Sequence, residues 1–320
     1  MTAPQTRSMT RIGIIGAGIM GERMLRAALD HASDLVEITA IWDASPEALA
    51  RIAPLGAPTA PSAAAAIEAA DCIYIATPPA THIAYADQAF AAGRAVFLEK
   101  PLATDVAAAQ AFVARAPARA AVNFPFASSF AVERLRSWIA DAPPPTSLTI
   151  TVAFATWPRP WQQAAATWLD APAEGGFTRE VVSHFLFLAR RTLGPLSLES
   201  ATVDRAPGTT ERRIEASLHA GPTPIHLIGE VGATQADDHN TWTLNGPGLR
   251  LRDWSWAERL IGGTWHPDTD AAPNERMRPL VLRRQLEGVV QMTRGNPHPL
   301  ATLQEALDVQ TIVERILSHD

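Results

Sequence analysis

Short apolar runs alternate with helical patterns over the first 124 residues. Five runs are rich in aliphatic residues and have the length of strands, at 11–15, 36–42, 71–76, 95–98 and 120–123. Helical patterns follow the first strand and recur between the later ones, at 62–70, 80–92 and 105–115. Strands that alternate with helices predict a parallel sheet with helices on both faces, which is the α/β Rossmann class.

A glycine-rich turn with the spacing Gly-x-Gly-x-x-Gly joins the first strand to its helix. Gly16 allows the tight turn, Gly18 lets the backbone approach a pyrophosphate, and Gly21 lets the helix pack near the strand. The helix N-terminus offers free N–H groups and a partial positive charge to phosphates. Because strand, turn, helix and second strand occur in this order, the motif predicts a dinucleotide cofactor.

An acid ends the second strand. Asp43 follows Gly21 by 22 residues, where a carboxylate can accept hydrogen bonds from the adenosine ribose and repel a 2′-phosphate. This position favours NAD over NADP, with NADP still open. The same carboxylate could instead cap a short helix over Pro46–Arg51.

Polar or turn residues stand at the carboxyl ends of the other predicted strands, where parallel sheets bind ligands. One cofactor could touch Gly16, Asp43, Thr77, Glu99, Lys100 and Asn123.

The pattern changes after a connecting helix over 129–140. Six strand-like runs separated by Gly, Pro or Asn turns follow, at 147–155, 196–204, 212–220, 225–231, 241–245 and 249–254. Further helices are predicted at 178–192, 274–293 and 303–317. We expect residues 1–124 to form a dinucleotide-binding Rossmann domain. Residues 125–320 should form a substrate and oligomerisation α+β domain with a predominantly antiparallel open sheet, whose final helix could pack back on the first domain.

Composition narrows the class of protein. The 320 residues are 47% hydrophobic and 19% charged, enough for two domains of ordinary size. The net charge is −6 and no basic stripe occurs, so we expect no nucleic-acid partner. No run of 18 apolar residues occurs, so we expect no membrane span. Residues 1–10 lack the apolar core of a secretion signal and are interpreted as a loose leader, so we expect a cytoplasmic location. The histidines and the single cysteine show no ligand spacing, so no metal site is expected.

Several longer motifs follow in order along nearly the whole chain. They span 16–21, 76–82, 92–102 with Glu99-Lys100-Pro101 inside it, 175–184 and 301–307. In this combination the chain resembles the Gfo/Idh/MocA oxidoreductases, the relatives of glucose–fructose oxidoreductase and inositol dehydrogenase. The resemblance implies a Rossmann domain joined to a sheet domain, NAD or NADP as cofactor, a small-molecule substrate, and a homodimer or homotetramer formed through the sheet face.

The resemblance also implies a catalytic set of Lys100, Glu180 and His184. His184 could accept a hydroxyl proton near neutral pH without a large pKa shift, and Lys100 could polarise the developing carbonyl or share in the proton relay. Glu180 could orient them, because residues four apart share a helix face. In the plainer alternative, Lys100 is a surface lysine and His184 a core residue.

The candidate cofactor-binding residues share positions in these motifs or at strand ends. They are Gly16, Gly18, Ile19, Met20, Gly21, Asp43, Thr77, Pro78, His82, Glu99, Lys100 and Asn123. For His82, stabilisation of the Thr77-Pro78-Pro79 turn is the alternative.

Departures from the family pattern concern the substrate. Glu180, Val182 and Phe187 replace the family's Asp, Gly and Asp, and an expected arginine is missing after Asn123. Polar substrate contacts could come instead from Trp157, Arg159 and Trp161, since a Trp face stacks on sugar rings and an arginine holds an anion or hydroxyl. Packing in the sheet core is an equal alternative for both tryptophans.

The sequence therefore predicts an NAD(P)-dependent oxidoreductase, NAD preferred, that transfers a hydride between nicotinamide and a hydroxyl or carbonyl of a sugar-like or other small polar substrate. Two alternatives stay open. One is an NAD-dependent glycoside-cleaving or epimerising enzyme with transient oxidation, which would accumulate no NADH. The other is a non-catalytic dinucleotide-binding sensor or scaffold, which the departures at Glu180, Val182 and Phe187 favour.

Overall fold

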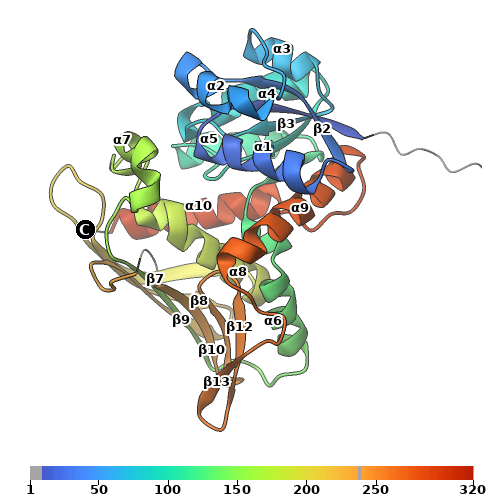
Figure 1. Cartoon of the computed structure of the whole chain (residues 1–320). Coiled ribbons are helices and arrows are strands. Elements are labelled where there is room, and N and C mark those ends of the chain that lie inside the picture. Colours follow the sequence, from blue (N-terminus) through green and yellow to red (C-terminus); the bar gives the residue numbers. More distant parts are fainter. Residues whose placement is uncertain (1–8, 237–238, 320) are drawn as a thin grey trace, which may run out of the picture.

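Two β-sheets organise the computed structural model, which describes residues 9–236 and 239–319 (Figure 1). Residues 1–8 of the predicted leader lie outside this part of the chain. No helix in the described ranges is both long and apolar enough to cross a membrane.

The first sheet is a parallel Rossmann sheet, as predicted. Its order is β2-β1-β3-β4-β5, from the strands β1 (Thr10–Ile15), β2 (Val36–Trp42), β3 (Cys72–Ile75), β4 (Ala95–Leu98) and β5 (Ala120–Val122). All four neighbouring pairs are parallel. The order reverses between β1 and β3, and such sheets bind ligands beyond the carboxyl ends of the strands at this point.

Helices cover both faces of the Rossmann sheet. They are α1 (Ile19–His31), α2 (Pro46–Ile52), α3 (Ala63–Glu68), α4 (His82–Ala91) and α5 (Val106–Arg115). On one face α1 packs with a helix from the far end of the chain, α9 (Asn274–Thr293), whereas α3, α4 and α5 fill the other. The domain boundary at residue 124 stays a prediction. Helix α9 lies in the predicted second domain by sequence, yet it contributes to the core of the first sheet.

The second sheet is mostly antiparallel, as predicted. Its order is β13-β12-β11-β10-β6-β9-β8-β7. The strands are β6 (Ser147–Phe154), β7 (Leu196–Asp204), β8 (Arg213–Ala220), β9 (Thr223–Val231), β10 (His239–Asn245), β11 (Leu249–Arg252), β12 (Trp256–Ile261) and β13 (Thr264–Pro267). One pair, β6 with β9, is parallel, because β6 enters the middle of the sheet from the first domain.

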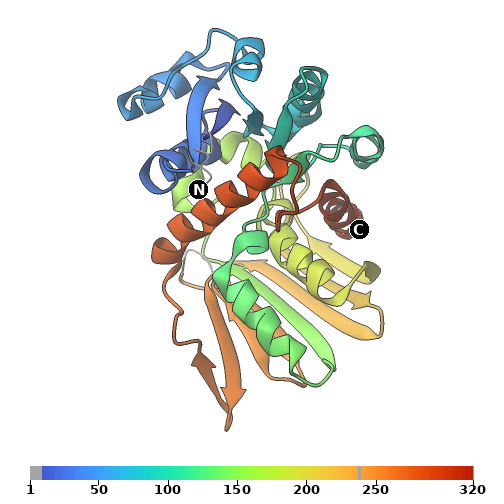
Figure 2. The same cartoon turned by 90° about the vertical axis from the view of Figure 1, so that its right-hand side faces the viewer.

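Helices cover one face of the second sheet and leave the other uncovered in the described ranges (Figure 2). The covering helices are α6 (Phe130–Ala140), α8 (Ser183–Leu193) and α10 (Leu303–Leu317). Short helical segments complete the chain: η1 (Ala53–Leu55), η2 (Pro79–Thr81), η3 (Pro125–Ser128), η4 (Pro160–Ala165), α7 (Ala166–Leu169) and the π-helical turn η5 (Thr178–Val182).

Helix α10 lies between the two sheets and joins their cores (Figure 1). It contacts α5 on the Rossmann side and α8 and β7 on the other side. Just before it, Ala301 forms a bridge with Val122 of β5. A capping box between Thr302 and Glu305 starts the helix, because each side chain bonds the other's backbone N–H. One continuous hydrophobic cluster therefore runs from the Rossmann sheet into the second sheet.

Candidate active site

The glycine turn leaves an open cradle at the start of α1. A Cβ on Gly16, whose φ is +102°, would lie 2.5 Å from the Ala76 carbonyl oxygen, and one on Gly21 would lie 1.8 Å from the Gly16 oxygen. Gly18 has no neighbouring heavy atom within 4 Å of such a Cβ. Two glycines thus permit close packing, while the third faces free space beside the α1 N-terminus. This arrangement fits the pyrophosphate of a dinucleotide.

Asp43 supports the turn from the end of β2. Its carboxylate accepts hydrogen bonds from the backbone N–H groups of Ala17, at 2.6 Å, and Ser45, at 2.8 Å. The N-cap of α2 is Ser45, whose hydroxyl accepts from the Ala48 N–H. The alternative that Asp43 itself caps this helix is therefore wrong. Its contact with a ribose stays a prediction.

A buried chain of polar side chains lies at the ends of β3, β4 and β5. Glu99 accepts hydrogen bonds from the Tyr74 hydroxyl and, at 2.7 Å, from the Asn123 amide. The Asn123 oxygen in turn accepts from Gln285 of α9. Burial raises the pKa of the Glu99 carboxyl, and burial together with the Glu99 charge raises the pKa of Tyr74. This hydrogen-bonded series of side chains fixes Glu99 next to Lys100.

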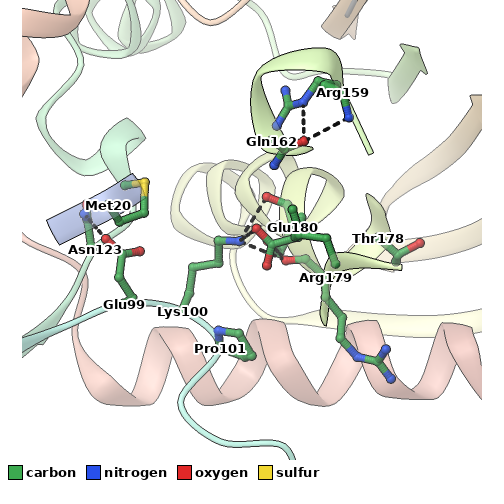
Figure 3. Close-up of polar contacts among 12 residues, drawn as sticks. Met20, Glu99, Lys100, Pro101, Asn123, Arg159, Gln162, Thr178, Arg179 and Glu180 are labelled. Atoms are coloured by element: carbon green, nitrogen blue, oxygen red, sulfur yellow. Dashed lines mark hydrogen bonds and ion pairs between the residues drawn. The ribbon is translucent and has the colours of Figure 1, made fainter. Parts of the chain in front are cut away.

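Lys100 crosses from the Rossmann domain to the second domain (Figure 3). Its ammonium lies 3.0 Å from the Glu180 carboxylate, and both side chains are largely buried, with 8% and 13% of their surfaces exposed. It also donates to the backbone oxygens of Glu180, at 3.0 Å, and Arg179, at 3.4 Å. Figure 3 shows Met20, Glu99 and Asn123 on the other side of the lysine. The structure therefore brings the predicted Lys100–Glu180 pair together.

The π-helical turn presents these acceptors. The sequence predicts one helix over 178–192, but the chain begins with a π turn and becomes α-helical only at Ser183. The wider turn releases carbonyls from the usual ladder, and such turns are frequent at functional sites. Arg179 anchors the turn through two 2.7 Å hydrogen bonds to Glu314 of α10.

His184 lies in an aromatic enclosure beside this pair. Its ring meets Phe124 and Trp254 edge-on, each at 5.4 Å between ring centres, and it meets Phe126 at 6.3 Å. Burial, with the charges of Lys100 and Arg159, lowers its pKa well below the ordinary value. The expectation of an almost unshifted pKa is therefore wrong, because the sequence does not show this enclosure or the two cations.

His82 is 1% exposed, and both ring nitrogens lie 2.8 Å from carbonyl oxygens, those of Thr77 and Pro101. It joins the loop after β3 to the loop after β4. The structure thus favours the turn-stabilising alternative over direct contact with a cofactor. Of the other candidates after β1 and β3, Ile19, Met20 and Thr77 are half-buried and Pro78 is exposed.

Of the predicted substrate residues, Trp157 lies in the core, and Trp161 and Arg159 lie at the edge of the site. Trp157 is 7% exposed, packs against Phe154 at 5.3 Å and donates its indole N–H to the Leu169 oxygen. Its position supports the core alternative. Trp161 is 42% exposed, and the Arg159 guanidinium lies 4.7 Å from its ring centre. Figure 3 shows Arg159 and its hydrogen-bond partner Gln162 above the Lys100–Glu180 pair.

Four residues that shape the site are not predicted from the sequence. Tyr74 and Gln285 belong to the Glu99 chain, Trp254 encloses His184, and Arg23 of α1 lies 5.2 Å from the Trp161 ring centre. Tyr74 and Gln285 looked like ordinary strand and helix residues. Trp254 has a φ of +71°, which is unusual for a bulky residue and appears only in the structure. Within the described ranges no group of three or more His, Cys, Asp or Glu side chains is placed to hold a metal.

Comparison with known proteins identifies the class of this fold. Residues 10–124 match the GFO_IDH_MocA model, described as an oxidoreductase family with an NAD-binding Rossmann fold. Inositol 2-dehydrogenase 3 of Saccharopolyspora erythraea is 38% identical over 99 residues, 30% of this chain and 29% of that protein. Rhizopine catabolism protein MocA of Rhizobium meliloti is 25% identical over 97% of this chain and 96% of that protein.

A solved oxidoreductase from Agrobacterium radiobacter, in complex with NAD+, L-tartaric acid and magnesium, shares the fold. Its TM-score is 0.77, at 18% identity over 96% of this chain and 95% of that one. The chain spans less than half the length of the first two curated relatives it matches. The molecule thus has an NAD-binding Rossmann domain joined to a mostly antiparallel sheet domain. The resemblance to the Gfo/Idh/MocA oxidoreductases is confirmed over residues 10–124, which match the model of that family's NAD-binding Rossmann fold.

Proposed function

We propose that this protein is an NAD-dependent oxidoreductase that interconverts a hydroxyl and a carbonyl of a small, sugar-like polar substrate. The observation that carries the proposal is the 3.0 Å ion pair between Lys100, at the end of β4, and Glu180, from the second domain. It sets a buried ammonium at the sheet edge where the family's fold holds its cofactor.

The cofactor residues of this proposal are those of the open cradle and its supports, Gly16, Gly18, Gly21 and Asp43, with Glu99 at the opposite end. NAD supplies a hydride acceptor, so the substrate carbon loses a hydride and its hydroxyl loses a proton. The contact of Glu99 with a bound nicotinamide is part of the proposal. The Asp43 carboxylate supports the preference for NAD over NADP.

Residues of both domains accept the proton and stabilise the developing charge. His184, held neutral by its lowered pKa, has a ring nitrogen lone pair that accepts the hydroxyl proton. The Lys100 ammonium stabilises negative charge on the substrate oxygen, and Glu180 holds that ammonium in place. In carbonyl reduction the same groups act in reverse.

Composition supports the role of Lys100 independently. It is the only lysine of the chain, beside 26 arginines. An ordinary surface position would tolerate either cation, whereas a compact ammonium with three donors and a planar guanidinium are not interchangeable at a shaped site.

The first test replaces this lysine. Lys100→Ala should lower turnover by at least about 10²-fold, as expected when a charge-stabilising group is lost, and should leave NADH affinity nearly unchanged. Lys100→Arg should not restore activity. Nicotinamide absorbance over a panel of sugars and polyols, with NAD and NADP, measures turnover, and fluorescence titration measures NADH binding.

Arg119→Ala is the matched control, because among the described residues this exposed cation bonds only the Gly93 carbonyl, far from the site. Full activity of Lys100→Ala would refute the assigned role. NADH binding by the wild type without turnover across the panel would favour the sensor or scaffold alternative. Substrate conversion without net NADH would favour transient oxidation.

We also propose that copies of the chain associate as a homodimer or homotetramer through the uncovered face of the second sheet. Its half-buried Thr149, Thr151, Thr241 and Thr243 lie opposite one another on the neighbouring strands β6 and β10 and make this face polar. Thr151→Arg should then lower the mass measured by light scattering. A monomeric wild type at micromolar concentration would contradict this assembly.

A further inference from the structure

Two guanidinium groups from different domains meet on one tryptophan beside the site. Arg23 of α1 lies 5.2 Å from the Trp161 ring centre, and Arg159 of the second domain lies 4.7 Å from it. Both distances are within the range of cation–π attraction. The Trp161 ring therefore holds two like charges near each other.

A third arginine approaches from α9. The charges of Arg278 and Arg159 both act on Arg23: burial, then Arg278, lower the Arg23 pKa to about 10. Arg278 stands seven residues before Gln285, so the two share a helix face, and Gln285 reaches Asn123 in the Glu99 chain. Charges from α9 and from the segment before η4 thus both act on the Arg23 guanidinium of α1.

Arg23, which the other two charges act on, forms no ion pair in the described part of the chain. In the same ranges Arg278 forms no ion pair with an acid either, and the hydrogen bond from Arg23 goes to the Met20 sulfur at 3.5 Å. Glu99 acts on Arg23, but burial raises the pKa of that carboxyl and so disfavours its charged form. Arg23 is half-buried, Arg159 is buried and Arg278 is exposed. Like charges around a half-buried guanidinium disfavour its charged form, and an anion that joins them favours it.

We infer that Arg23, Arg159 and Arg278 form an anion subsite, and that the substrate of this enzyme is a sugar-like molecule carrying a carboxylate or a phosphate. The inference rests on the proposed oxidoreductase function and specifies the substrate class. Guanidinium groups bind both anions through paired N–H donors. The exposed Trp161 face lies between two of them and can stack on the ring of the same substrate.

The position of the subsite favours the substrate over the cofactor pyrophosphate. The pyrophosphate cradle is the free space at Gly18, at the first turn of α1. Arg23 lies one turn farther along α1 and contacts Met20. The Arg23 charge interacts with Tyr74 and Glu99, at the Lys100 end of the site. An anion held there lies beside the reacting groups.

The test measures binding first, without requiring turnover. Inorganic phosphate is titrated into the NADH complex of the wild type, Arg23→Gln, Arg278→Gln and Arg276→Gln, with tryptophan fluorescence or calorimetry as the readout. Arg276 is the matched control, an exposed arginine on the same helix that no ion pair engages in the described ranges. Phosphate should bind at least about tenfold more weakly to the first two variants and unchanged to the control, as expected for a lost charge-assisted hydrogen bond.

The second arm compares matched sugars. Uronic acids and sugar phosphates should exceed their neutral parent sugars in kcat/KM by about tenfold or more in the wild type, and Arg23→Gln should reduce that preference. Absence of phosphate binding, equal binding to Arg23→Gln, or an equal loss of NADH affinity in that variant would overturn the subsite. Turnover of neutral sugars would then leave the oxidoreductase proposal standing. Phosphate binding as expected, with no turnover of any sugar, would overturn the oxidoreductase proposal and leave the subsite.

Discussion

His184 shows how much a neighbourhood changes one residue. A histidine has an ordinary pKa of about 6.5, but burial and the cations Lys100 and Arg159 disfavour the imidazolium here. The ring therefore stays neutral at neutral pH, which is the state that accepts a proton. Its lowered basicity also means that it releases the proton readily to solvent.

The pH dependence of kcat follows from the lowered pKa of His184. A base works only when unprotonated, and a lowered pKa moves its protonation to lower pH, so oxidation should stay active well below pH 6.5. Arg159→Gln removes one cation, raises the His184 pKa and should shift the acid limb of the kcat profile upward. A limb at or above the ordinary histidine pKa in the wild type would show that His184 is not the base.

Single residues were predictable when a motif defined their surroundings. Lys100, Glu180 and the glycine turn stand where the motifs predict, because backbone spacing fixes them. Arg23 was missed because its partner Trp161 lies 138 positions away, and no local pattern reports such a contact. Trp157 and Trp161 look alike in sequence, and only burial separates them.

At the scale of elements, the π-helical turn depends on its anchor to α10. Arg179 and Glu314 are 11% and 23% exposed, and Arg179 also donates to the carbonyls of Pro172 and Gly175. The guanidinium thus holds three segments together. This geometry keeps the Arg179 and Glu180 carbonyls directed at Lys100.

Arg179→Gln should therefore lower stability by about 2–3 kcal/mol, since it leaves a largely buried carboxylate unpaired, and should also lower kcat. Arg190→Gln is the matched control in the same α8–α10 interface, because its pair with Asp308 is 25% and 32% exposed. That variant should lose less than about 1 kcal/mol. Urea unfolding and steady-state kinetics measure both effects. Equal losses in the two variants would contradict the anchoring role.

Elements with a clear period were predicted, and those without one were missed. Along β8 and most of β6, buried positions alternate with half-buried or exposed ones, as the sequences indicate. The strand β12 does not alternate: its first three residues are at least half-buried and its last three are exposed, so the hairpin with β13 went unrecognised. The π turn was also missed, because one extra residue per turn leaves the hydrophobic pattern nearly unchanged.

At the scale of the whole molecule, the two sheets share one hydrophobic cluster. Buried residues of β4, α8 and α10 belong to the same cluster, and α9 adds to the far face of the Rossmann sheet. The antiparallel pattern of the second half predicted the class of its sheet. The long-range position of α9 against α1 could not be predicted, since helix amphipathicity does not name a partner.

A shared core should make unfolding cooperative. We expect one transition in urea, with far-ultraviolet circular dichroism and tryptophan fluorescence coincident, although two sheets are present. The fluorescence reports mainly on the second domain, because seven of the nine tryptophans lie between Trp157 and Trp265. Separated midpoints would show that the domains unfold independently.

The parallel pairing of β6 with β9 has a consequence for the chain as it leaves the ribosome. β6 is the first strand of its sheet to be synthesised, yet its two neighbours, β9 and β10, begin only at Thr223 and His239. Until roughly a quarter of the protein more has been translated, the apolar residues of this strand lack their final neighbours. The nascent second domain is therefore a natural client for chaperones that shield unpaired strands.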